Sequence, residues 1–189
     1  KKTVIIYTSD NGFFCGSHGF GSKVLPYEES SRVPLILLDP RHPNSGRKIR
    51  CGELTGNIDF APTILALAGI EIPGSMDGKN LMKLYDRPRE KIHESLPLIN
   101  VWGPRPTFSL SIVTRDLKYI YWPYQDDKTR PAEELYELAN DPLELSNVVK
   151  FSRFKEGLQK QYDRVVSQWK QAGVDYHGYE GLGEFFERN

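Results

Sequence analysis

An apolar, β-prone run at residues 3–8 ends in Asp10, Asn11 and Gly12. Near-continuous apolar residues predict a strand buried on both faces of a parallel sheet, and open α/β sheets bind ligands at the carboxyl ends of their strands. The side-chain oxygens of Asp10 and Asn11 are hard ligands of the kind that Ca²⁺ and Mg²⁺ accept. Because Asp-Asn-Gly is also ordinary turn chemistry, these residues alone leave open a metal site or a plain turn.

The glycine-rich loop that follows carries two more side chains capable of chemistry, His18 and Lys23. A lysine ammonium is a compact positive charge with several donors, which suits an anionic ligand. A histidine in such a loop can donate to an anion or shuttle a proton, and it can equally cap the loop by bonding backbone carbonyls. Without further context, Lys23 would be a solvated loop residue.

The motifs between residue 3 and about residue 147 supply that context. Their types and order resemble the sulfatase family of the alkaline phosphatase superfamily. One such motif would be weak, but the whole series in the family's order makes chance a poor explanation. The matching segments are residues 8–12, 16–19, 23, 27–30 leading into 32–35, 57–70, and 134–138 followed by 140–142.

The resemblance implies a role for each candidate residue. In sulfatases, the residues matching Asp10 and Asn11 bind a divalent metal, usually calcium, and the lysine matching Lys23 binds the sulfate and helps the leaving oxygen depart. Fixed cations at those points lower the barrier to cleavage of a sulfate ester. His18 is placed near the same pocket, as a catalytic group or as a loop cap. Arg105 could meet an anionic or polyhydroxylated substrate, with surface packing as its alternative.

The family's nucleophile is a formylglycine made from the first residue of a Cys- or Ser-x-Pro-x-Arg signature. Neither Cys15 nor Cys51 is followed by that pattern, and no serine is. The resemblance therefore implies the C-terminal part of a longer sulfatase, with the formylglycine and an N-terminal acidic metal pair outside this chain. We expect the chain alone to have no turnover. Glu28, Glu29 and Arg32 are interpreted as structural ion pairs and caps.

The expected fold class is α/β: the C-terminal portion of an alkaline-phosphatase-like fold, with a mostly parallel sheet flanked by helices. A smaller antiparallel sheet with a long packed helix would follow it. Residues 1–90 would form the C-terminal part of the catalytic α/β domain, and residues 91–189 would form a smaller C-terminal subdomain. Within the first part we expect a second buried strand at residues 33–38 and a helix that Asp59 caps and Gly69 ends.

The second part is predicted to begin with a hairpin of residues 109–114 and 118–122, followed by a strand at 134–138. A long helix over residues 152–172 would stop at Gly173. Of two histidines outside the motifs, His42 is interpreted as a solvent-facing loop residue, with a place at a substrate entrance as its alternative, and His177 as structural or exposed. Apolar side chains at a spacing of three and four predict core packing for Phe151, Phe154, Leu158, Tyr162, Val165, Val166 and Trp169.

Composition limits the partners. The 25 basic and 25 acidic residues balance, which gives no electrostatic case for nucleic acid or an anionic membrane. No apolar run approaches the roughly 18 residues of a membrane span. The expected partner is a small or carbohydrate sulfate ester, with homo-oligomerisation and pairing of the two cysteines left open. Only the resemblance indicates a compartment, which would be periplasmic, secreted or lysosomal.

Two other functions compete with a sulfatase. Phosphodiester and phosphonate hydrolases of the same superfamily more often carry Asp-His where this chain has Asp10-Asn11, which favours the sulfatase. A degenerate sulfatase-like module used for sugar binding or assembly would not need Asp10, Asn11 and Lys23 intact. The substrate itself, whether sulfated carbohydrate, choline sulfate or aryl sulfate, depends on loops and on parts outside this chain.

Overall fold

A computed structural model describes residues 3–173 and 181–188, so His177 lies outside the described residues. The chain divides into two compact units, each with its own contacts. The first comprises Lys1–Asp10 and Val33–Leu96, and the second comprises Asn11–Arg32 and Pro97–Asn189. Residues 11–32 thus pack with the C-terminal half of the chain. The domain boundary expected at residue 90 stays a prediction for the full-length protein.

The first unit contains a two-stranded sheet in which β1 and β4 run antiparallel, with Ile6 opposite Leu37. The expected parallel pairing was wrong for these two strands, and Ile5, Tyr7 and Ile36 are each more than half exposed in this chain. Apolar composition reports a tendency to burial and not the direction of the partner strand. The elements of this unit are β1 (Ile5–Tyr7), β4 (Ile36–Leu38), η2 (Asn57–Asp59), α2 (Phe60–Leu67) and α3 (Lys83–Asp86).

The sequence predicted that the Asp59 side chain would cap α2. This was wrong, because that side chain makes no capping hydrogen bond to α2. Its fully buried carboxylate instead accepts the Gly56 N–H at 2.9 Å and the Lys79 N–H at 2.7 Å. One of its oxygens also lies 2.8 Å from Nε2 of His93. Asp59 therefore joins three separate segments of the first unit. The end of α2 is as predicted, because Gly69 adopts the left-handed conformation with φ 72°.

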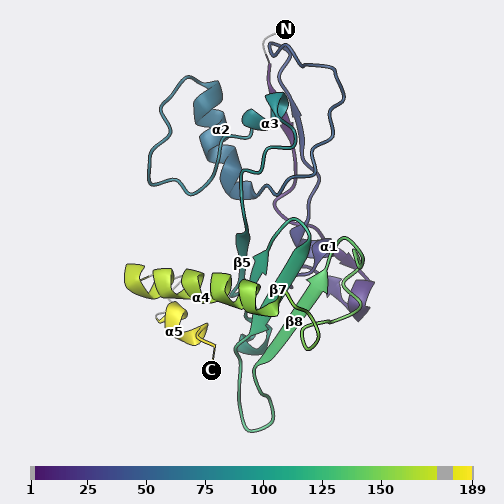
Figure 1. Ribbon diagram of the computed structural model, residues 1–189, viewed down its shortest axis with the longest axis vertical. Helices are drawn as coiled ribbons and strands as arrows, with labels where there is room; N and C mark the ends of the chain where they lie inside the picture. The colour runs from purple at the N-terminus through teal and green to yellow at the C-terminus, as the bar shows by residue number, and fades with distance from the viewer. Residues whose placement is uncertain (1–2, 174–180, 189) are drawn as a thin grey trace. The chain divides into compact units, whose positions relative to one another are not determined.

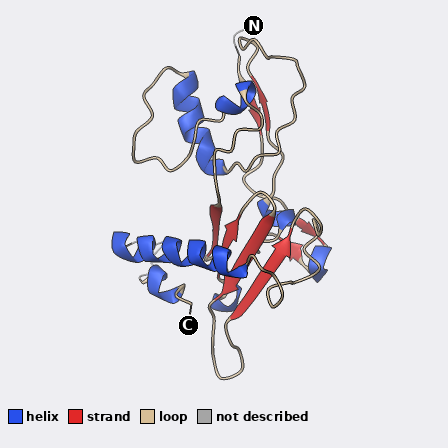
Figure 2. Cartoon of the chain, viewed as in Figure 1, coloured by secondary structure: helices blue, strands red, loops and turns tan. Residues whose placement is uncertain are grey.

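The second unit is built on a four-stranded sheet in the order β5-β6-β7-β8 (Figure 2). The predicted hairpin is confirmed, since β6 and β7 pair antiparallel with Val113 opposite Lys118. The mixed α/β class, with an antiparallel C-terminal sheet and a long helix, is therefore also confirmed. The strands are β5 (Leu96–Asn100), β6 (Ser109–Val113), β7 (Leu117–Trp122) and β8 (Ala132–Glu137), with η3 (Arg105–Thr107) before β6.

One face of this sheet packs against α4 (Lys155–Ala172), which lies across the strands, and α5 (Leu182–Phe185) lies beside α4 (Figure 1). Gly173 ends α4 at φ 58°, as predicted. The prediction failed for Phe151, which is 89% exposed, because it keeps the spacing in sequence but precedes the first residue of the helix. Phe154 is also exposed. The core on this face includes Leu110, Ile112, Tyr119, Tyr121, Leu135, Leu158, Tyr162 and Val166.

The opposite face of the same sheet packs against residues 11–32. Side chains alternate between the two faces of a strand, so Ile120 and Tyr136 point away from α4 and cluster with Phe14 and Tyr27. The packed segment consists of β2 (Phe14–Cys15), η1 (Ser17–Gly19), β3 (Gly21–Ser22) and α1 (Glu28–Ser31).

Both cysteines, Cys15 and Cys51, are free thiols on the surface. Among the residues described, no helix combines the length and apolar character that a bilayer crossing requires.

Candidate functional site

The structure brings together two of the residues that the sequence singled out, Asn11 and Lys23. The Lys23 ammonium donates to Oδ1 of Asn11 at 3.0 Å, while Nδ2 of Asn11 donates to the Gly12 carbonyl oxygen at 2.7 Å. Lys23 is exposed and Asn11 is half-buried. The amide oxygen of Asn11 therefore accepts from an ammonium through one lone pair, which leaves its second lone pair for another partner such as a metal ion.

The chain reaches this arrangement through a small hairpin and a close backbone approach. Strands β2 and β3 pair with Phe14 opposite Ser22, which returns the chain to Lys23 beside Asn11. The Gly12 N–H donates to the carbonyl oxygen of Ser30 at 2.8 Å. A Cβ at Gly12 would lie 1.9 Å from the backbone oxygen of Glu29, so only glycine fits here.

Asp10 belongs to the first unit and is exposed. Asn57 donates from Nδ2 to the backbone oxygen of Asp10 at 3.1 Å, which fixes the end of the β1 segment. The Ser9 hydroxyl donates to Oδ1 of Asp10 in a long hydrogen bond of 3.4 Å. The donor set of Asp10 and Asn11 consists of hard oxygens, so it fits Ca²⁺ or Mg²⁺ in chemistry. Two ligands are fewer than either ion takes, so further ligands would have to come from other groups or water.

His18 has a different set of partners. Its ring stacks on Tyr27, with the centroids 4.4 Å apart and the planes at 17°. Its Nε2 lies 3.6 Å from Oε2 of Glu29, and both atoms are buried. These contacts suit a histidine that fixes the glycine loop against α1. A catalytic role for His18 stays a prediction.

Sequence reasoning missed a buried ion network beneath α1. The Lys118 side chain of β7 is 0% exposed, and its ammonium lies 2.8 Å from Oε1 of Glu28 and 2.9 Å from Oε1 of Glu144. It also donates to the Pro26 carbonyl oxygen at 2.8 Å. Burial raises the pKa of the Glu144 carboxyl, and the nearby Lys118 charge opposes that rise. Glu28 and Arg32 form an ion pair at 3.5 Å, as the sequence predicted.

The signal that could have revealed this network is the single lysine inside β7, which otherwise reads as an apolar, aromatic strand. Potential ligand atoms of His18, Glu29 and Glu144 lie within 4.8 Å of one another. Because the Lys118 ammonium already contacts Glu144, this cluster has a built-in cation. We therefore interpret the cluster as structural.

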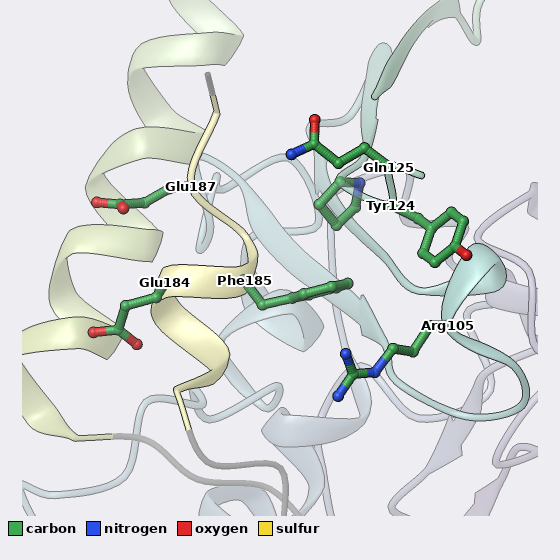
Figure 3. Close-up of a pocket in the computed structure, with 7 residues that line it drawn as sticks. Arg105, Tyr124, Gln125, Glu184, Phe185 and Glu187 are labelled. Carbon is green, nitrogen blue, oxygen red and sulfur yellow. The ribbon is translucent and has the colours of Figure 1, made fainter. Parts of the chain in front are cut away.

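Arg105 lines a pocket of about 250 Å³ in the second unit (Figure 3). Its guanidinium and the Phe185 ring point toward each other across the pocket, and Tyr124 lies on the Arg105 side. The full lining, Arg105, Pro123, Tyr124, Gln125, Glu184, Phe185 and Glu187, includes no residue of the 11–32 segment. A cation beside an aromatic ring can bind a sugar or an anion, but the role of Arg105 in substrate binding stays a prediction.

Comparisons with known proteins identify the family of this chain. A family model described as N-sulphoglucosamine sulphohydrolase, C-terminal, matches residues 16–172. An N-acetylglucosamine-6-O-sulfatase of Bacteroides thetaiotaomicron is 29% identical over 183 residues, which cover 92% of this chain and 32% of that protein. Arylsulfatase K of Homo sapiens is 27% identical over 186 residues, covering 95% of this chain and 34% of that protein.

A solved structure described as a complex with its substrate D-glucosamine-2-N,6-O-disulfate superimposes with a TM-score of 0.70 at 28% identity. The match covers 89% of this chain and 35% of that one. The chain thus spans about a third of the length of the relatives it matches. Because the family model covers most of the chain, this chain belongs to the sulfatases, in the family of N-sulphoglucosamine sulphohydrolase C-terminal regions.

Proposed function

We propose that the full-length protein carrying this chain hydrolyses a sulfate ester. In this proposal Asp10 and Asn11 contribute to a site for a divalent metal, with calcium as the expected ion, and Lys23 binds the sulfate group. The observation that carries the proposal is the 3.0 Å contact between the Lys23 ammonium and the Asn11 amide oxygen. Two residues twelve apart in sequence, each matched to a sulfatase motif, meet at one point.

The chemistry of sulfate ester cleavage explains why such a pair is useful. As the bond between sulfur and the bridging oxygen breaks, negative charge moves onto that oxygen and is shared by the other sulfate oxygens. The Lys23 ammonium has three donors, so it can keep its bond to Asn11 while donating to a sulfate oxygen and to the departing oxygen. A bound metal ion would supply Lewis-acid polarisation of the sulfate. The formylglycine nucleophile is expected outside this chain.

A sulfated sugar is the substrate class that we propose. It is supported by the N-acetylglucosamine-6-O-sulfatase relative and by the glucosamine disulfate bound in the similar structure. The exposed Arg105 beside Phe185 would offer a second contact for such a substrate, through a charge and an apolar ring face. His18 would support the loop that carries Lys23.

The test is hydrolysis by the full-length protein of N-acetylglucosamine 6-sulfate, an aryl sulfate and the matching phosphate esters. We expect sulfate release and, for Lys23→Ala, a turnover lower by about 10²- to 10³-fold, the scale seen when one electrostatic stabiliser is removed. Lys150→Ala changes another exposed lysine, outside the site, so it should retain wild-type turnover.

Other outcomes would redirect the proposal. Faster cleavage of phosphate than of sulfate esters would favour the phosphodiester or phosphonate hydrolase. Binding of sulfated sugar without hydrolysis of any ester would favour a sugar-binding module. Wild-type kinetics in Lys23→Ala would remove Lys23 from the mechanism.

A further inference from the structure

The backbone on both sides of Lys23 adopts conformations that L-amino acids rarely adopt. Val24 has φ 103° and Ser22 has φ 69°. A positive φ is a genuine outlier for a β-branched residue such as valine, because its Cβ substituents crowd the backbone. Such conformations persist only where the surroundings hold them, and they concentrate at functional sites. Something must therefore hold Val24.

Ser30 of α1 contacts the Val24 backbone. Its side-chain oxygen accepts the Val24 N–H at 3.0 Å, and the serine is only 6% exposed. The carbonyl oxygen of Ser30 accepts the Gly12 N–H at 2.8 Å. Ser30 thus binds the residue after Lys23 through its side chain and the residue after Asn11 through its backbone.

The helical turn α1, which carries Ser30, is itself held by the buried side chain of Lys118 in β7. The buried Lys118 ammonium bonds the Pro26 carbonyl oxygen and the Glu28 carboxylate, on the segment that leads into α1 and on its first residue. The Glu28 N–H donates to Oε2 of Glu144 at 2.6 Å. The position of Ser30 is therefore set by the charged face of the sheet.

We propose that Ser30 is a positioning residue for Lys23: its hydroxyl holds the strained Val24 backbone and so keeps the Lys23 ammonium on Asn11. This inference rests on the proposed sulfatase function for its effect on turnover. Its structural part, the dependence of the Lys23 loop on the Ser30 hydroxyl, is measurable without any activity.

The two bonds of Ser30 predict a separation of effects. Ser30→Ala removes the acceptor for the Val24 N–H but keeps the backbone bond to Gly12. The loop around Lys23 should relax while the Asn11 side of the site stays in place. Turnover should therefore fall while calcium affinity stays at the wild-type value.

The experiment uses the full-length protein with Ser30→Ala and, as a matched control, Ser31→Ala. The Ser31 hydroxyl donates to the Tyr27 carbonyl oxygen at 3.0 Å and accepts from the Lys118 ammonium at 3.3 Å, but it makes no bond to Val24. For Ser30→Ala we expect kcat on the order of 10-fold lower, because small misplacements of a positioned group cost up to about 100-fold. Hydrogen exchange in a peptide covering residues 22–27 should be about tenfold faster. Ser31→Ala should retain the wild-type kcat and exchange rate in that peptide.

A double-mutant cycle with Val24→Gly distinguishes positioning from a general loss of stability. Glycine adopts a positive φ without strain, so Ser30→Ala should cost much less turnover in the Val24→Gly background. An equal loss in both backgrounds would overturn the proposal, as would wild-type exchange at residues 22–27 in Ser30→Ala. If the wild-type protein hydrolyses no sulfate ester, the proposed function fails, while the exchange measurement still decides whether Ser30 holds the loop.

Discussion

The two faces of the four-stranded sheet share the same strands but differ in the kind of interaction that each face makes. On one face Tyr119, Tyr121 and Leu135 pack against α4 in an apolar core. On the other face Lys118, whose neighbours along β7 are aromatic and apolar, ends in a buried ion network under α1. The first face carries the long helix, and the second carries the segment with Asn11 and Lys23.

The difference separates stability from position. Burial of apolar area is favourable but has no preferred direction, so the α4 face can adjust to small changes in shape. A buried ion network adds little net stability, because removing charges from water costs about as much as their attraction returns. The buried ion network does, however, require its charged and hydrogen-bonding atoms to lie at defined positions. The charged face is therefore suited to fixing a site and the apolar face to holding the unit together.

The largest expected effect comes from breaking the charged face. Lys118→Met would leave the buried Glu144 carboxylate without its cation and Glu28 with only the exposed Arg32, and should lower the free energy of unfolding by about 3–5 kcal/mol. Urea denaturation of the full-length protein measures this. Adding Glu144→Gln to Lys118→Met removes the buried charge that has lost its cation and should recover part of the loss. A single-variant loss below about 1 kcal/mol would mean that the network is already open to water.

A cavity on the apolar face should cost somewhat less and should leave the site unchanged. Leu158 of α4 is 3% exposed within the core, so Leu158→Ala should lower the free energy of unfolding by about 2–4 kcal/mol. Leu158→Met keeps the volume and should cost less than about 1.5 kcal/mol. Because α4 packs on the face opposite to Lys118, we expect wild-type kcat in both variants well below their unfolding temperatures. A lower kcat in Leu158→Ala would show that the two faces are coupled.

Glu133 tests the charged rim of the α4 face through pH. Burial alone would raise the pKa of its carboxyl, but hydrogen bonds from Lys155, Tyr119 and Gln159 outweigh burial and lower the pKa to about 2, against an ordinary value of 4.5. Because the folded-state pKa is the lower one, this stabilisation is present above about pH 4.5 and is lost as the pH falls toward 2.

Glu133→Gln should therefore lower the free energy of unfolding at pH 7 by about 1–2 kcal/mol, after allowance for solvent screening. The difference from wild type should shrink on acidification, and unfolding free energies at pH 7 and near pH 3 measure it. A constant difference between these pH values would assign the effect to lost packing and not to the charge.

The same comparison explains which parts could be predicted from sequence. The apolar face was predictable because hydrophobic periodicity is local: the hairpin turning near Asp116 and the end of α4 at Gly173 both follow from neighbouring residues. The Asn11–Lys23 pair was predictable only through the family's motif order. The network of Lys118 with Glu28 and Glu144 was not, because its members are distant in sequence and charged residues usually indicate a solvated surface. The predicted direction of β1 relative to β4 was wrong for a related reason: the composition of a strand does not specify its partner.

The smallest expected change in the free energy of unfolding is at Phe151, where the apolar spacing of α4 continues in sequence beyond the start of the helix. Phe151 continues the apolar spacing of α4 in sequence, but it precedes the first residue of the helix and is 89% exposed. Phe151→Ala should therefore change the free energy of unfolding by no more than about 0.5 kcal/mol, as surface substitutions generally do. Val166→Ala, from the buried part of the same pattern, is the matched control and should cost well over about 1 kcal/mol. Similar losses for the two variants would place Phe151 in a contact that the rest of the full-length protein provides.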